Sequence, residues 1–113
     1  MIERRFARTR EPVAAARLYL DHLVRGAQGL RAAVVIDNGR VVAGAGMPAA
    51  DLAQVARAAE DQDASVAPKP SLRGDLFIHR ILVRGRRHVF VTLGGRARRV
   101  RDVERDLARI LAA

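Results

Sequence analysis

The sequence predicts a mixed α/β domain of the α+β class, built in the order α-β-β-α-β-β-α. Two segments are each a pair of apolar runs around a glycine-containing turn, which is typical of a β-hairpin. Three other segments carry apolar residues at helical spacing. Both faces of each predicted hairpin are apolar, so both need a cover. We expect an antiparallel sheet with helices 1 and 3 on one face and helix 2 on the other.

The first helix is expected from Pro12 to Gly26. Proline suits the first position of a helix, and glycine favours its end. The apolar residues of this segment fall on one helical face, as an amphipathic helix requires. They are Val13, Ala16, Leu20, Leu23 and Val24.

The first hairpin is expected between Gly29 and Gly46, with Asn38-Gly39 as a type I′ turn. This turn pairs Asp37 with Arg40 and Ile36 with Val41. The resulting pleat places one apolar set on each face of the sheet. One set is Val34, Ile36, Val41 and Ala43, and the other is Val35 and Val42.

A second helix is expected after Gly46, followed by a loop from Gln62 to Gly74 that contains two prolines. The helix is rich in alanine, so its surface is flat and permits close approach of a neighbour. Its apolar stripe is Leu52, Val55, Ala56 and Ala59.

The second hairpin is expected within residues 75–95, with Gly85-Arg86 as a type II′ turn. This register gives two faces, one with Ile78, Leu82, Val89, Val91 and Leu93, the other with Phe77, Ile81, Val83 and Phe90. The last helix carries the stripe Val100, Val103, Leu107, Ile110 and Leu111, which we expect to dock on the sheet.

Composition limits the class of protein. The chain has 113 residues, enough for one domain, which we place at residues 12–113 after a flexible basic arm at residues 1–11. The absence of cysteine excludes disulfides and thiol chemistry. The apolar runs are too short to span a membrane, and the charged N-terminal segment lacks the apolar stretch of a signal peptide. We expect a cytoplasmic protein without membrane insertion.

The net charge is +9, carried by 20 arginines and one lysine. This excess favours acidic partners such as nucleic acid, anionic lipid or an acidic protein face, and does not choose among them. Four arginines near the start of the last helix oppose the helix dipole, so they are candidate contacts for an anion or an acidic partner. They are Arg96, Arg98, Arg99 and Arg101; two further groups are Arg4, Arg5, Arg8 and Arg10 in the arm and Arg84, Arg86 and Arg87 in the second hairpin.

No catalytic, cofactor-binding or metal-binding residue is predicted. The stretch GAGMPA at residues 44–49 matches a dinucleotide-binding pattern, but the strand before it belongs to a hairpin and not to a βαβ unit. We interpret it as the exit from the sheet. His22, His79 and His88 lack cysteine or carboxylate neighbours at ligand spacing, and Tyr19 has no evident base partner.

The order of elements and the local sequence resemble the roadblock family of dynein-light-chain-type domains. The resemblance runs from about Val13 to Ala113 and includes the turn-and-strand segment NGRVVA at residues 38–43. It also includes the hairpin segment IHRILVRGRRHVFVTLGG at residues 78–95. Family members have a roadblock/profilin-like fold, usually with five strands and a longer second helix. Here the third strand is missing or reduced to the loop at residues 62–74.

The resemblance implies a non-catalytic dimeric adaptor or regulator that binds a small Ras-like GTPase or another roadblock-type protein. It implies a homodimer through the second helix, whose candidate interface residues are Ala49, Leu52, Ala53, Val55, Ala56 and Ala59. The residues identify no arginine finger. Two alternatives remain open: a basic nucleic-acid-binding domain, supported by the charge, and a small enzyme with profilin-like or GAF-like sensor ancestry.

Overall fold

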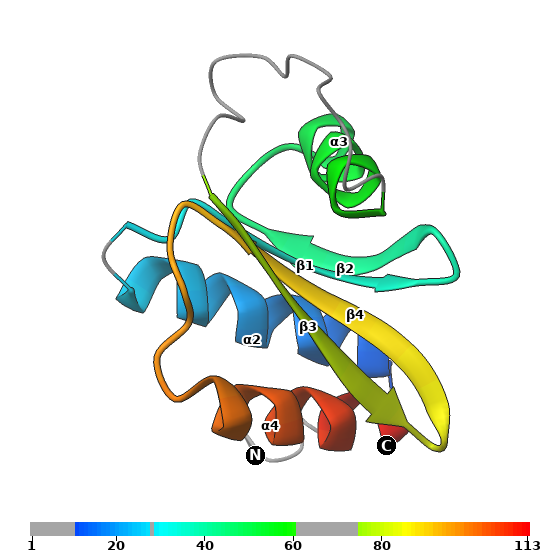
Figure 1. The fold of residues 1–113 in the computed structure, drawn as a ribbon. Coiled ribbons are helices and arrows are strands. Elements are labelled where there is room, and N and C mark those ends of the chain that lie inside the picture. The colour runs from blue at the N-terminus through cyan, green and yellow to red at the C-terminus, as the bar shows by residue number, and fades with distance from the viewer. Residues whose placement is uncertain (1–10, 28, 61–74) are drawn as a thin grey trace.

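A computed structural model describes residues 11–27, 29–60 and 75–113. Figure 1 shows an antiparallel sheet with helices on both sides. The predicted order α-β-β-α-β-β-α is confirmed. The elements are α2 (Pro12–Gly26), β1 (Ala32–Asp37), β2 (Arg40–Ala45), α3 (Ala49–Glu60), β3 (Leu76–Val83), β4 (Arg86–Leu93) and α4 (Val100–Ala112).

The sheet has the strand order β2-β1-β4-β3, so β1 of the first hairpin pairs with β4 of the second. Helices α2 and α4 pack on one face and against each other, and α3 packs on the opposite face. This is the predicted arrangement of helices. Two apolar layers result, one on each side of the sheet. The α2/α4 layer includes Leu20, Val35, Phe90 and Leu107, and the α3 layer includes Val34, Ile36, Leu52 and Val91.

The first hairpin has the predicted turn. Asn38 and Gly39 have φ values of 53° and 81°, and Ile36 pairs with Val41 as expected. The placement of Ala43 on the same face as Val34 is wrong. A β-bulge between Val35 and Ile36 makes Ala43 the partner of Val35, so Ala43 is buried in the α2/α4 layer. An extra residue reverses the alternation of the strand beyond it.

The second hairpin turns one residue earlier than predicted. The turn residues are Arg84 and Gly85, with φ values of 54° and 80°, and Val83 pairs with Arg86. This is a second type I′ turn. The predicted type II′ turn is wrong because Arg84 adopts the left-handed conformation that its residue type disfavours. The predicted faces survive, since moving a two-residue turn by one position leaves opposing residues on the same side.

At the end of each hairpin, a glycine allows close approach of the backbone to the segment that precedes β1. A Cβ atom on Gly46, at φ 101°, would lie 2.3 Å from the Arg31 carbonyl oxygen. One on Gly94, at φ 96°, would lie 2.5 Å from the Gly29 carbonyl oxygen. The Gly94 amide donates to the backbone carbonyl of Asp75, which closes the start of β3 against the end of β4. The interpretation of the GAGMPA glycines as a sheet exit fits this geometry.

The helices α2 and α4 are linked by a half-buried hydrogen bond, which the Tyr19 hydroxyl donates to Asp106 at 2.9 Å. Arg109 donates to the same carboxylate, also at 2.9 Å. Burial, followed by the bond to Asp106, raises the pKa of Tyr19 above the usual tyrosine value of 10.0. At a pH between the two pKa values, Tyr19 therefore keeps its hydroxyl proton in the folded chain and loses it in the unfolded chain.

This retained proton predicts a pH dependence of stability. As pH rises above about 10, the unfolded state is favoured, so the free energy of unfolding should fall. The Tyr19→Phe variant should lose about 1 kcal/mol at neutral pH with the hydrogen bond, and should then show a shallower alkaline decline. Urea denaturation at a series of pH values measures both slopes. Parallel declines in the two proteins would contradict the assignment.

The predicted arm at residues 1–11 lies outside the described residues except for Glu11, which precedes α2. The predicted loop at residues 62–74 also lies outside them. Whether a reduced third strand forms there is therefore outside the described structure.

Candidate interaction surface

The sheet face that carries α3 is only partly covered by the described elements. Helix α3 packs on β2 and β1 and reaches β4, but makes little contact with the edge strand β3. In Figure 1, β3 runs away from α3 toward the other end of the molecule. Leu82 on β3 is 63% exposed. The part of the sheet beyond α3 is therefore the main uncovered surface among the described strands.

Four residues form this surface, which we call the β3 surface: Arg80, Leu82, Arg87 and Val89. The pairing of β3 with β4 fixes how they lie. Leu82 is directly opposite Arg87, and Arg80 is directly opposite Val89. Val89 packs against the α3 layer, so all four side chains are on the α3 side. Apolar and cationic side chains thus alternate in two rows, with the two guanidinium groups on one diagonal and the two apolar groups on the other.

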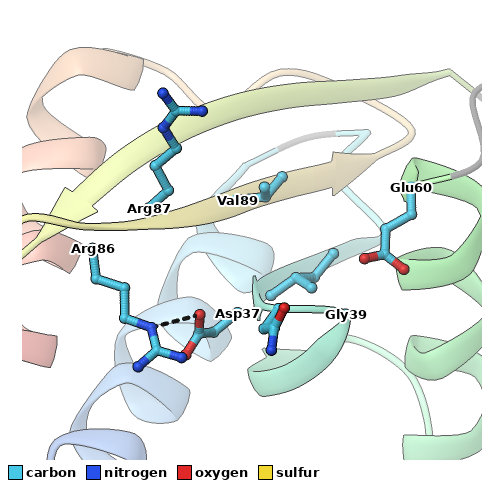
Figure 2. Close-up of a pocket in the computed structure, with 8 residues that line it drawn as sticks. Asp37, Gly39, Glu60, Arg86, Arg87 and Val89 are labelled. Carbon is cyan, nitrogen blue, oxygen red and sulfur yellow. Dashed lines mark hydrogen bonds and ion pairs between the residues drawn. The ribbon is translucent and has the colours of Figure 1, made fainter.

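The β3 surface continues into an open pocket of about 530 Å³. Ile36 and Val89 are its apolar residues, and the turn residues Asn38 and Gly39 form part of its wall. Figure 2 shows the Glu60 side chain extending from the end of α3 toward the pocket. The charged groups that line the pocket therefore include the Glu60 carboxylate at the end of α3 and the Arg87 guanidinium on β4.

Arg86 and Arg87 leave β4 in opposite directions (Figure 2). Arg86 donates from Nε to Asp37 at 3.1 Å, and His88 Nε2 is 3.8 Å from the same carboxylate. The turn residue Arg84 donates to the Ala112 carbonyl at the end of α4. Of the three arginines predicted as a group in the second hairpin, Arg84 and Arg86 thus bind other parts of the chain. The third, Arg87, belongs to the β3 surface.

The six candidate interface residues of the second helix separate into two sets. Leu52, Val55, Ala56 and Ala59 are buried against the sheet and do not reach the surface of the chain. Ala49 and Ala53 are exposed on the outer side of α3. The dimer through this helix stays a prediction, and only the second set is free to contact another chain.

The candidate arginines at the start of α4 are all exposed. The Arg96 guanidinium carbon lies 4.9 Å from the centroid of the Phe77 ring. Arg99 precedes α4 with φ 49°, and its carbonyl accepts from the Asp102 and Val103 amides. Arg98 and Arg101 have no hydrogen bond or ion pair with another of the described residues. Their role toward an anion stays a prediction.

The histidines belong to separate surroundings. His22 is exposed. His79 stacks on Phe90 with ring centroids 6.0 Å apart, and its Nδ1 lies 3.6 Å from Glu104. Its buried Nε2 has no hydrogen-bond partner among the described residues. Within the described parts of the chain, no three His, Cys, Asp or Glu side chains are grouped as a metal site would need.

Sequence reasoning missed Arg80 and the exposure of Leu82. The alternation of β3 placed Leu82 on one face with Val89, which is confirmed. The missing information was the strand order, because β3 is left beyond the reach of α3 only when it occupies the sheet edge. The position of the charged residue Arg80 within a mostly apolar strand was a signal of this exposure.

The chain matched none of the protein-family models, curated proteins or solved structures with which it was compared. The roadblock resemblance accordingly stays a prediction. Of the helices described, none combines the length and apolarity that crossing a membrane requires.

Proposed function

We propose that this chain is a non-catalytic dimeric adaptor that binds a small Ras-like GTPase or another roadblock-type protein. The observation that supports it best is the uncovered sheet surface on the edge strand β3, beside α3, in a fold of the order α-β-β-α-β-β-α. The proposal assigns the chain no catalytic residue, cofactor or metal.

An edge strand with an exposed apolar residue favours association. The outer edge of β3 presents backbone N–H and C=O groups that no described strand pairs. A domain of this size also buries a limited share of its surface, so a second chain adds stability. A binding role uses these features directly, whereas in a monomer they would be a liability.

The outer side of α3 is the proposed contact between two copies. Ala49 and Ala53 carry no bulk beyond Cβ, so a second helix can approach closely. The Ala53→Glu variant should keep its fold, with the free energy of unfolding changed by no more than about 0.5 kcal/mol, because the site is exposed in one chain. It should convert a species near twice 12.4 kDa into one near 12.4 kDa.

Light scattering at moderate and high salt measures these masses. His22→Glu is the matched control, since it places the same side chain at an exposed site on α2. It should leave the dimer intact. A wild-type monomer at both salt concentrations, or equal dissociation by both variants, would count against the proposed dimer.

The partner class requires a separate test. The purified chain should be used as bait in a native lysate, with bound proteins identified by mass spectrometry. The proposal expects a small GTPase or a second roadblock-type protein among them, reduced when the bait is unfolded by heat. Recovery of neither class from lysates in which both are present would overturn the adaptor function.

A further inference from the structure

We infer that the β3 surface binds an acidic protein segment, whose carboxylates pair with Arg80 and Arg87 and whose apolar side chain contacts Leu82 and Val89. The inference takes from the proposed function only that the partner is a protein. It adds the chemistry by which that partner is recognised.

Charge carries the first step. Arg80 and Arg87 are both exposed, and the described residues hold no carboxylate in an ion pair with either one. Other exposed arginines are paired within the chain, such as Arg105 with Asp102 at 3.1 Å and Arg109 with Asp106 at 2.9 Å. Diagonal positions on neighbouring antiparallel strands lie roughly 7–8 Å apart, so the two guanidinium groups repel each other. An acidic partner relieves this repulsion.

The apolar residues favour a protein over a nucleic acid. Phosphates would neutralise both guanidinium groups but would leave Leu82, 63% exposed, facing water. The β3 surface also lacks an aromatic side chain on which a base could stack. A protein segment with apolar side chains covers Leu82 and Val89 and gains their burial.

Spacing defines the form of the segment. Arg80 and Leu82 are two residues apart on one strand, so their side chains leave the sheet roughly 7 Å apart. An extended segment repeats with the same period, so alternate side chains match this row. The pocket lies to one side of this row, across β4, where Arg87 and Val89 line it. Glu60 at the pocket would repel a carboxylate there, which restricts the acidic positions to the β3 side.

The test starts from random eight-residue peptides, the length of β3, displayed and selected on the immobilised full chain. The enriched sequences should carry net negative charge, with carboxylates and apolar residues in alternation. A labelled copy of the most enriched peptide should then lose at least about tenfold in affinity to the Arg80→Glu, Arg87→Glu double variant. The Leu82→Ser variant should also weaken it.

The matched control is Arg17→Glu with Arg25→Glu, which changes the net charge equally at exposed sites on α2. This control should bind within about twofold of wild type. Circular dichroism and solution mass of each variant verify that fold and oligomeric state are unchanged.

Four results of the binding experiments would overturn the inference. These are a selection that enriches nothing, enriched peptides without net negative charge, equal loss in both double variants, and a single-stranded oligonucleotide that requires Arg80 and Arg87 when no peptide does. Conversion of the chain to a monomer by the Arg80/Arg87 substitutions would assign the surface to a second copy and also overturn it. Failure of the proposed adaptor function is distinct, since it appears as a wild-type monomer without GTPase or roadblock-type partners, whatever the peptides show.

Discussion

Replacing Gly46 by alanine is expected to lower the free energy of unfolding by about 3–5 kcal/mol. The new Cβ would lie 2.3 Å from the Arg31 carbonyl oxygen and 3.0 Å from the Ala32 Cα. Both are backbone atoms at the start of β1, a central strand, so relief requires β1 or the exit from β2 to move. The φ of 101° adds strain, because residues with a Cβ rarely adopt it.

Urea denaturation followed by circular dichroism measures this loss. Gly26→Ala is the matched control, because a Cβ added there would meet no atom within 4 Å beyond its own helix and chain neighbours, and the site ends α2. It should change stability by less than about 1 kcal/mol. If Gly46→Ala and Gly26→Ala had similar midpoints, the close crossing of residues 31 and 46 would be wrong.

Replacing Phe90 by alanine is expected to cost about 3–5 kcal/mol. Phe90 is 0% exposed at the centre of the α2/α4 layer, on the central strand β4, with Val35 and His79 opposite it on the two neighbouring strands. Removing its ring leaves a cavity beneath two helices, and also leaves His79 without the ring on which it stacks.

Phe77→Ala is the comparison for this substitution. Phe77 is half-buried on the edge strand β3, so less apolar surface and fewer contacts are lost there. Thermal unfolding of the two variants should rank Phe90→Ala well below Phe77→Ala. The reverse order would place the core of the protein elsewhere.

Local sequence signals predicted the elements and their layers because most of them act over a few residues. Asn38-Gly39 selects a type I′ turn by itself, and it was predicted correctly. Arg84-Gly85 forms the same turn, but the pattern of glycine followed by another residue indicated a different one. The β-bulge, in which Val42 is the extra residue opposite Val35 and Ile36, has no local sequence signature. It depends on how β1 pairs with β2.

The candidate surface was less predictable than the fold. The alanines of α3 were identified together, yet only the helix orientation separates exposed Ala53 from buried Ala56. Arg87 was grouped with Arg84 and Arg86 by position in the sequence, but only pairing across the turn shows that it lies beside Leu82 and opposite in direction to Arg86. These juxtapositions depend on strand order and register.

The pairing of β1 with β4 has a consequence for the kinetics of folding. Each hairpin joins residues that are close in sequence, and such contacts form early, within roughly 1–10 μs for an isolated hairpin. Val34 and Val91 pair across more than half of the chain, so the two halves must meet before either apolar layer is complete. Loop-closure entropy opposes that encounter, which makes the joining of β1 to β4 the expected slow step in folding. The same seam is buried beneath helices on both faces, so it should open only when the whole domain unfolds.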